Sequence, residues 1–131
     1  MDKVRPLLLI VDDHKLLSEF LNDFYSEHFD VIVFNDGKEA QSFIRTSGSA
    51  IDAALIDLHM PLIDGDELID EILLVSPSAC IRLITGDIQN EKVKTALINF
   101  GISTIPKPFE ITELEQFQQS VFAKFLDVSG F

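Results

Sequence analysis

Several acidic side chains stand where short apolar runs of the chain end. Asp12 and Asp13 follow the run at residues 7–11, and Asp57 follows the run at residues 53–56. Two carboxylates about 4 Å apart repel each other by roughly 4 kcal/mol at an effective dielectric constant of about 20. A cluster of such groups therefore needs a positive charge. A hard divalent cation such as Mg²⁺, which prefers oxygen ligands, is one way to provide it.

A hydroxyl group and an ammonium group follow two further apolar runs. Thr85 and Gly86 follow residues 81–84, and Lys107 comes shortly after residues 103–105. The Lys107 ammonium is a point charge that suits a carboxylate or a phosphoryl oxygen. For any single one of these polar residues, a strand terminus or a helix cap is the simpler interpretation. Their joint placement after four different runs favours a functional site.

Five apolar runs predict the strands that must position these groups, and segments with helical spacing separate them. Most of the runs are nearly continuous, which is typical of parallel strands buried on both faces. Strict alternation predicts an α/β fold: a doubly wound five-stranded parallel sheet with five helices, in the flavodoxin-like strand order 2-1-3-4-5. Ligands bind outside the carboxyl ends of such strands, so the polar groups share one edge. The runs are residues 7–11, 31–34, 53–56, 81–84 and 103–105.

Local signals mark where helices begin and end. Three pairs match a side-chain cap followed by an acid three residues later, and two glycines suit helix ends. Met60-Pro61 and Gly65 are typical of a tight loop that uses positive φ at glycine. The caps are Asp36 with Glu39, Asp64 with Glu67, and Thr112 with Glu115, and the glycines are Gly48 and Gly101.

Length and charge limit the classes of function. With 131 residues, we expect a single domain over residues 1–131 with a core at about residues 4–125. The formal net charge of −12 argues against direct nucleic acid binding and against a membrane surface. Cys80 is the single cysteine and no secretory leader pattern is present, so we expect a cytoplasmic location and a core role for Cys80.

The order of the motifs resembles that of the receiver domains of bacterial two-component response regulators. The matching motifs are the pair Asp12-Asp13, DLHMPLIDG with Asp57, Thr85-Gly86 and Lys107-Pro108, and the resemblance covers about residues 4–125. It implies a signalling switch rather than an enzyme, with self-directed phosphotransfer and autodephosphorylation only.

The resemblance also implies the roles of the site residues. Asp57 is the implied phosphoryl acceptor. The implied Mg²⁺ ligands are Asp13, Asp57, the backbone carbonyl of His59, and Asp12, the last through water. Thr85 is the implied switch hydroxyl, and Lys107 pairs with the phosphoryl group.

One position departs from the family pattern. Thr104 stands three residues before Lys107, where an aromatic residue is usual. We hypothesise that the signal instead leaves through residues 85–90 and the helix that follows.

Partners follow from the same resemblance. A sensor histidine kinase or phosphotransfer protein is the implied donor, and a downstream effector protein or a C-terminal output domain outside this chain is the implied target. The kinase, the stimulus, the oligomeric state, including a phosphorylation-dependent homodimer, and whether the chain is a piece of a longer protein stay open.

Two other functions are alternatives to the signalling switch. One is a degenerate receiver that acts as a protein-interaction adaptor. The other is a Mg²⁺-dependent aspartyl-phosphate hydrolase of the haloacid dehalogenase type, for which VDDH lacks the expected DxD spacing.

Four further side chains have interpretations of their own. His14 and His28 are expected on the surface rather than as phosphohistidines. We expect the Arg82 charge to reach water at the amino-terminal edge of the sheet. Phe122 lies off the main apolar stripe of its helix and, if exposed, would mark a docking patch.

Overall fold

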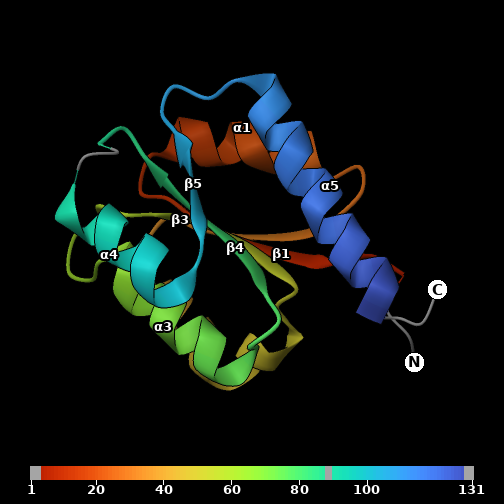
Figure 1. Ribbon diagram of the computed structural model, residues 1–131, viewed down its shortest axis with the longest axis horizontal. Helices are drawn as coiled ribbons and strands as arrows, with labels where there is room; N and C mark the ends of the chain where they lie inside the picture. Colours follow the sequence, from red (N-terminus) through yellow and green to blue (C-terminus); the bar gives the residue numbers. More distant parts are fainter. Residues whose placement is uncertain (1–3, 88–89, 129–131) are drawn as a thin grey trace.

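The computed structural model describes residues 4–87 and 90–128, without the side chains of residues 96, 97, 127 and 128, and its elements alternate as predicted (Figure 1). The strands are β1 (Leu7–Val11), β2 (Asp30–Phe34), β3 (Ala53–Asp57), β4 (Cys80–Thr85) and β5 (Ser103–Pro106). The helices are α1 (Lys15–Tyr25), α2 (Gly37–Ser47), α3 (Gly65–Val75), α4 (Glu91–Phe100) and α5 (Ile111–Val128), with a short 3₁₀ turn η1 (Gly48–Ala50).

The five strands form one parallel sheet in the order β2-β1-β3-β4-β5, which confirms the predicted topology. Asp57 pairs with Ile84, and Thr85 pairs with Pro106. Backbone pairing therefore continues through two polar residues that the apolar pattern excludes from the strands. As a result, the Asp57 carboxylate and the Thr85 hydroxyl belong to residues whose backbones are paired within the sheet.

Helices cover both faces of the sheet. In Figure 1, α1 and α5 lie on one side of it, and α3 and α4 lie on the other. Because side chains alternate along a strand, Leu9 and Val11 of β1 pack toward the α2, α3 and α4 side, and Leu8 and Ile10 pack toward α1 and α5. Burial on both faces explains why the strand sequences are nearly continuous in apolar residues.

Aromatic packing joins α1 to α5. The buried Tyr25 hydroxyl donates a hydrogen bond of 2.8 Å to the carbonyl of Leu114, and burial raises the pKa of this phenol well above its ordinary value. Phe122 is half-buried and its ring lies 5.2 Å from that of Phe29, so it is core rather than an exposed docking patch. Cys80 also packs against this cluster, as expected.

Arg82 and the two histidines lie near the surface. The Arg82 guanidinium turns toward the amino-terminal end of β4, where it donates to the Ile81 carbonyl at 3.2 Å, and it lies 5.5 Å over the Phe117 ring. His14 and His28 are exposed, as predicted. His14 also caps α1, because its Nδ1 accepts a hydrogen bond from the Leu17 amide.

The predicted helix ends are confirmed in part. Asp36 caps α2 by accepting from the Lys38 amide at 2.7 Å, and Gly101 follows α4 with φ of 65°. Asp64 precedes α3 but makes no side-chain cap, because its carboxylate contacts the Lys92 ammonium of α4 instead. The prediction for Thr112 is also wrong: α5 begins at Ile111, so Thr112 lies inside the first turn.

The loop after β3 turns in a different way from the one predicted. The positive φ of this loop belongs to Leu62, at 72°, and not to Gly65. Gly65 is needed for space instead, because a Cβ at this position would lie 2.3 Å from the Asp57 carbonyl oxygen. This close approach lets the Gly65 amide donate to the Leu58 carbonyl at 2.9 Å and seats α3 against the end of β3.

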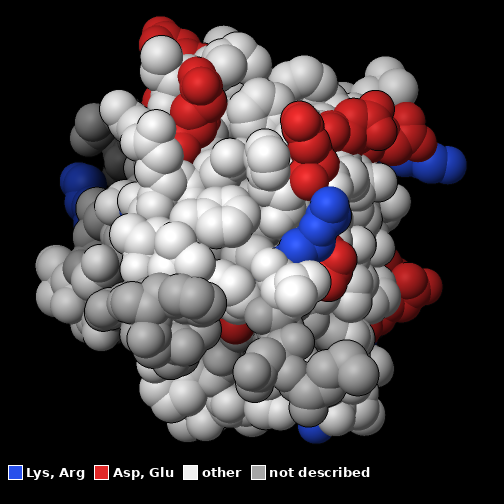
Figure 2. Space-filling view, turned by 90° about the vertical axis from the view of Figure 1, so that its right-hand side faces the viewer, with Lys and Arg blue, Asp and Glu red and all other residues white. Residues whose placement is uncertain are grey.

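Charge is distributed as the composition predicts. On the face in Figure 2, acidic side chains gather mainly in the upper and right-hand parts, and the few lysine and arginine side chains lie apart from one another. In the part of the chain that the structure describes, no helix is both long and apolar enough to cross a membrane.

Replacing Gly65 by alanine should lower the free energy of unfolding by about 2 kcal/mol or more, because the added methyl group collides with backbone rather than with a side chain that can move. Urea denaturation measures this change. Gly86→Ala is the control: among the described residues, the nearest atom to its added Cβ would be the Lys107 carbonyl oxygen, at 3.7 Å, so the loss should stay within about 0.5 kcal/mol. Equal stability of the two variants would contradict the steric account.

Candidate functional site

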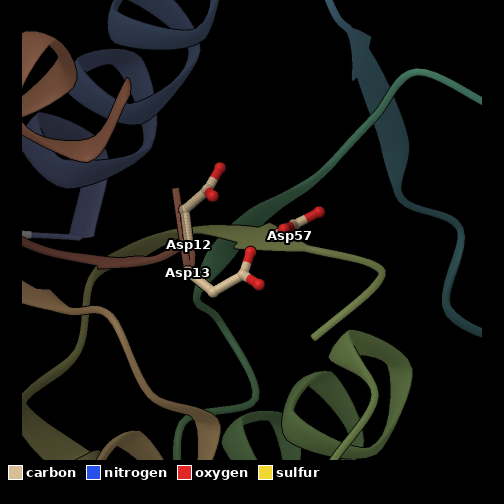
Figure 3. Close-up of side chains that lie close together, drawn as sticks. All are labelled: Asp12, Asp13 and Asp57. Atoms are coloured by element: carbon tan, nitrogen blue, oxygen red, sulfur yellow. The ribbon is translucent and has the colours of Figure 1, made fainter. Parts of the chain in front are cut away.

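Three carboxylates converge at the carboxyl edge of the sheet (Figure 3). Asp12 and Asp13 follow β1, and Asp57 is the last residue of β3, the strand next to β1. Each carboxylate offers an oxygen that lies within 4.8 Å of the other two. Asp12 and Asp57 are buried and Asp13 is exposed, so one side of the group opens to water.

The two oxygens of the Asp12 carboxylate have different partners. Oδ1 accepts a hydrogen bond of 2.8 Å from the His14 amide. Oδ2 is buried and accepts no hydrogen bond from the described residues, although the Lys107 ammonium lies 3.1 Å from it as an ion-pair partner. This oxygen therefore depends on an ammonium group that also pairs with Asp57, and it can still accept a hydrogen bond from water.

Asp57 carries the strongest electrostatic perturbation of the site. It is only 5% exposed, its Oδ1 lies 3.6 Å from Lys107 Nζ, and the His59 amide donates to the same oxygen at 3.4 Å. Burial, followed by the negative charge of Asp12, raises the pKa of Asp57 to about 7, and the Lys107 ammonium offsets part of this effect. Without a metal ion, the carboxyl group is therefore poised between its neutral and charged forms near neutral pH.

Thr85 and Lys107 complete the same edge. Thr85 is buried at the end of β4, and its Oγ1 accepts a hydrogen bond of 3.0 Å from the Asp87 amide. The Lys107 amide donates to the Thr85 carbonyl at 3.0 Å, which ties the end of β5 to the end of β4. The Lys107-Pro108 peptide bond is cis. The structure thus brings together the three acids and the lysine that were predicted to meet, and Thr85 ends the neighbouring strand at the same edge.

The His59 ring lies at the outer rim of this edge. Its side chain is exposed, and Nε2 lies 3.5 Å from the Asn90 amide nitrogen at the start of α4. The backbone amide of His59 is the group that reaches Asp57. Thr104 is half-buried on β5, where it pairs with Leu83 of β4. Strand β4 therefore lies between Thr104 and β3, which carries Asp57.

Two contacts of the site have no counterpart in the sequence-based prediction. The Asn35 side-chain amide at the end of β2 donates to the Asp12 carbonyl and to the Ser18 hydroxyl, each at 2.8 Å. The sequence places Asn35 at a strand end, but only the order of the strands shows that this end lies beside the turn of Asp12 and Asp13. Ser18 is also buried although it is polar.

The chain is similar in sequence to proteins of a known family. The family described as the response regulator receiver domain matches residues 8–119. A response regulator receiver protein of Anaeromyxobacter sp. (strain Fw109-5) is 30% identical over 107 residues, which are 81% of this chain and 44% of that protein. The DNA-binding response regulator MtrA of Mycobacterium tuberculosis is 30% identical over 115 residues, covering 87% of this chain and 49% of MtrA. The chain thus spans about half the length of these relatives.

Solved structures agree in fold. The receiver domain of the Francisella response regulator 1452 is 28% identical, with a TM-score of 0.73 over 95% of this chain and 99% of that one. A CheY-like receiver domain protein from Methanospirillum hungatei JF-1 is 21% identical, with a TM-score of 0.81 over 94% of this chain and 98% of that one. The family match extends from β1 into α5 and so includes every strand end described above, and on this basis the chain belongs to the receiver domains of response regulators.

Proposed function

We propose that this receiver domain is a phosphorylation-dependent switch in which Asp57 accepts a phosphoryl group from a histidine kinase or a phosphotransfer protein. The observation that carries the proposal is the placement of a buried carboxylate between two further acids and an ammonium group at one sheet edge. Family membership supports phosphorylation-based signalling in general. The identity of the donor and the roles of individual residues are part of the proposal.

The donor atoms of this edge suit Mg²⁺. All three side chains offer oxygen, the buried Asp12 Oδ2 has no hydrogen bond within the described chain, and the exposed Asp13 leaves room for the waters that Mg²⁺ usually keeps. Asp13, Asp57 and the His59 carbonyl would hold the ion directly, and Asp12 would hold it through water. When bound, the ion supplies positive charge that offsets the carboxylates and the charge on phosphoryl oxygens.

The side chains of the chain have distinct roles in phosphoryl transfer. An oxygen of the Asp57 carboxylate attacks the phosphorus of a phosphohistidine; the new P–O bond forms as the P–N bond breaks, and the imidazole leaves. Lys107, which lies near Asp57 and Asp12 alike, pairs with the phosphoryl oxygens. Thr85 reorients its hydroxyl toward the phosphoryl group, which breaks its hydrogen bond with the Asp87 amide.

Transmission of the signal would use α4 rather than an aromatic side chain on β5. The Asn90 amide near His59 and the Lys92 contact with Asp64 both connect the loop after β3 to the start of α4. Residues 88–89 of the hypothesised path lie outside the described residues. The target would be an effector protein or an output domain, in the cytoplasm, and a phosphorylation-dependent homodimer is one form that the response could take.

Phosphorylation of Asp57 can be tested with Mg²⁺ and a small-molecule phosphodonor. We expect an acid-stable, base-labile phosphate on Asp57, because an acyl phosphate hydrolyses readily in base. Asp57→Asn should abolish the label, whereas Asp70→Asn, an exposed position on α3, should retain it. Absence of label on the unmodified chain would favour the adaptor function. Multiple turnover of a phosphoester would favour the hydrolase.

The raised pKa of Asp57 predicts a pH-dependent effect of Asp57→Asn on stability in the presence of a chelator. The folded chain binds the proton up to about pH 7, whereas the unfolded chain releases it near pH 4, so ionisation destabilises the folded state as the pH rises between these values. Near pH 8 the variant should be more stable than the unmodified chain, by at most about 4 kcal/mol, and near pH 4 the difference should vanish. Denaturation at a series of pH values measures this. A difference that is independent of pH would refute the predicted ionisation.

The two adjacent acids should contribute unequally to Mg²⁺ affinity. Asp12 already lies 3.1 Å from the Lys107 ammonium, whereas Asp13 is exposed and is the proposed direct ligand. Calorimetric titration should therefore show a larger loss of affinity for Asp13→Ala than for Asp12→Ala, with Asp23→Ala on the exposed surface of α1 as the control for lost charge. The reverse order would overturn this division of roles.

A further inference from the structure

The turn that carries the acidic pair is fixed by a side chain from a different strand. Asn35 follows β2, and its amide nitrogen donates two hydrogen bonds of 2.8 Å, one to the Asp12 carbonyl and one to the Ser18 hydroxyl. An amide nitrogen has two protons, so both bonds can form at once. Asn35 therefore links the end of β2 to both ends of the turn between β1 and α1.

Ser18 connects Asn35 to the first turn of α1 through hydrogen bonds. Its side chain is buried, and its hydroxyl accepts from Asn35 while it donates to the Lys15 carbonyl at 2.9 Å. A buried hydroxyl that both accepts and donates has a defined orientation. The loss of Asn35 would thus remove the partner of a buried group as well as the direct bond to Asp12.

The restraint acts where the carboxylates repel each other. In the metal-free chain, the charges of Asp12, Asp13 and Asp57 favour an opening of the turn. The Lys107 ammonium and the backbone amides of His14 and His59 offset these charges in part. The carboxylate of Asp12 is oriented by the His14 amide, and its carbonyl is held by Asn35. The Asp12 amide also donates to the Phe34 carbonyl at 3.1 Å, so three hydrogen bonds hold this residue in place before any cation arrives.

We propose that Asn35, together with Ser18, is a positioning residue that holds the Asp12-Asp13 turn in its metal-binding geometry in the metal-free chain. Asn35 itself is not a ligand. Its contribution is preorganisation, so that binding of Mg²⁺ does not have to supply the energy to close the turn. The inference rests on the proposed function, since it concerns the affinity of the same site.

The test compares Asn35→Ala with Asn22→Ala. The control removes the same type of side chain from the far end of α1, where it accepts a hydrogen bond from the Ser26 hydroxyl. For Asn35→Ala we expect Mg²⁺ affinity, measured by calorimetry, to fall about three- to tenfold, the value of one hydrogen bond. The phosphorylation rate should return to that of the unmodified chain at saturating Mg²⁺, because the reacting groups are intact.

A second readout needs no metal. In the presence of a chelator, amide hydrogen exchange at His14, Leu17 and Ser18 should be faster in Asn35→Ala, while the strand amides stay protected; these three amides make the hydrogen bonds of the turn. Ser18→Ala should show a smaller effect of the same kind. The combination of Ser18→Ala with Asn35→Ala should be less than additive, because both side chains act in one network.

The outcomes separate this inference from the proposed function. Unchanged Mg²⁺ affinity and unchanged exchange at the turn in Asn35→Ala would overturn the inference and leave phosphorylation of Asp57 untouched. Faster exchange over the whole sheet with unchanged affinity would make Asn35 a general structural residue and would also overturn it. If the unmodified chain bound no Mg²⁺ and took no phosphate, the proposed function would fail, and this inference with it.

Discussion

Repulsion among three carboxylates at the end of a buried sheet is the interaction on which the rest of the structure depends. Asp12 and Asp57 are removed from water, and the ammonium of Lys107 lies within 3.1 and 3.6 Å of them. One positive charge cannot neutralise the three carboxylates when all of them are ionised. Burial, followed by the negative charge of Asp12, raises the pKa of Asp57. A site of this kind gains stability from any ligand that brings positive charge.

The fold makes this crowding unavoidable. Parallel pairing of β1 with β3 puts their carboxyl ends side by side, and pairing of β3 with β4 puts Thr85 beside them. The close approach of Gly65 to Asp57 then closes the loop beneath the site. Each of these features belongs to the backbone: Asp57 is held within the sheet, and Asp12 and Asp13 lie in the turn that directly follows β1. Stability of the sheet is thus the source of the energy that keeps like charges together.

Much of this arrangement could be predicted from the sequence, because buried parallel strands leave a direct pattern. The apolar runs gave the five strands to within one residue at each end, and the polar residues after them indicated the edge where a site forms. The pattern missed the last residue of β3 and of β4, because Asp57 and Thr85 are polar although the ladder includes them. Periodicity reports burial, and it cannot report where backbone pairing stops.

Contacts between distant side chains could not be predicted in the same way. Asp64 stands in a local sequence that is typical of a helix N-cap, yet its carboxylate pairs with the Lys92 ammonium of α4. The local sequence does not reveal this long-range contact. The same is true of Asn35, whose partners lie in the turn after β1 and in α1. Gly65 was expected to supply positive φ, but its role is steric and depends on the position of the Asp57 backbone.

The most direct test of the central claim is the dependence of stability on Mg²⁺. If the carboxylates of the folded chain repel one another and converge on a cation site, the free energy of unfolding should rise with the concentration of Mg²⁺ as expected for a ligand that binds only the folded state. NaCl at equal ionic strength should have a much smaller effect, because screening acts weakly on buried charges. Equal stabilisation by the two salts, or none by either, would contradict the account.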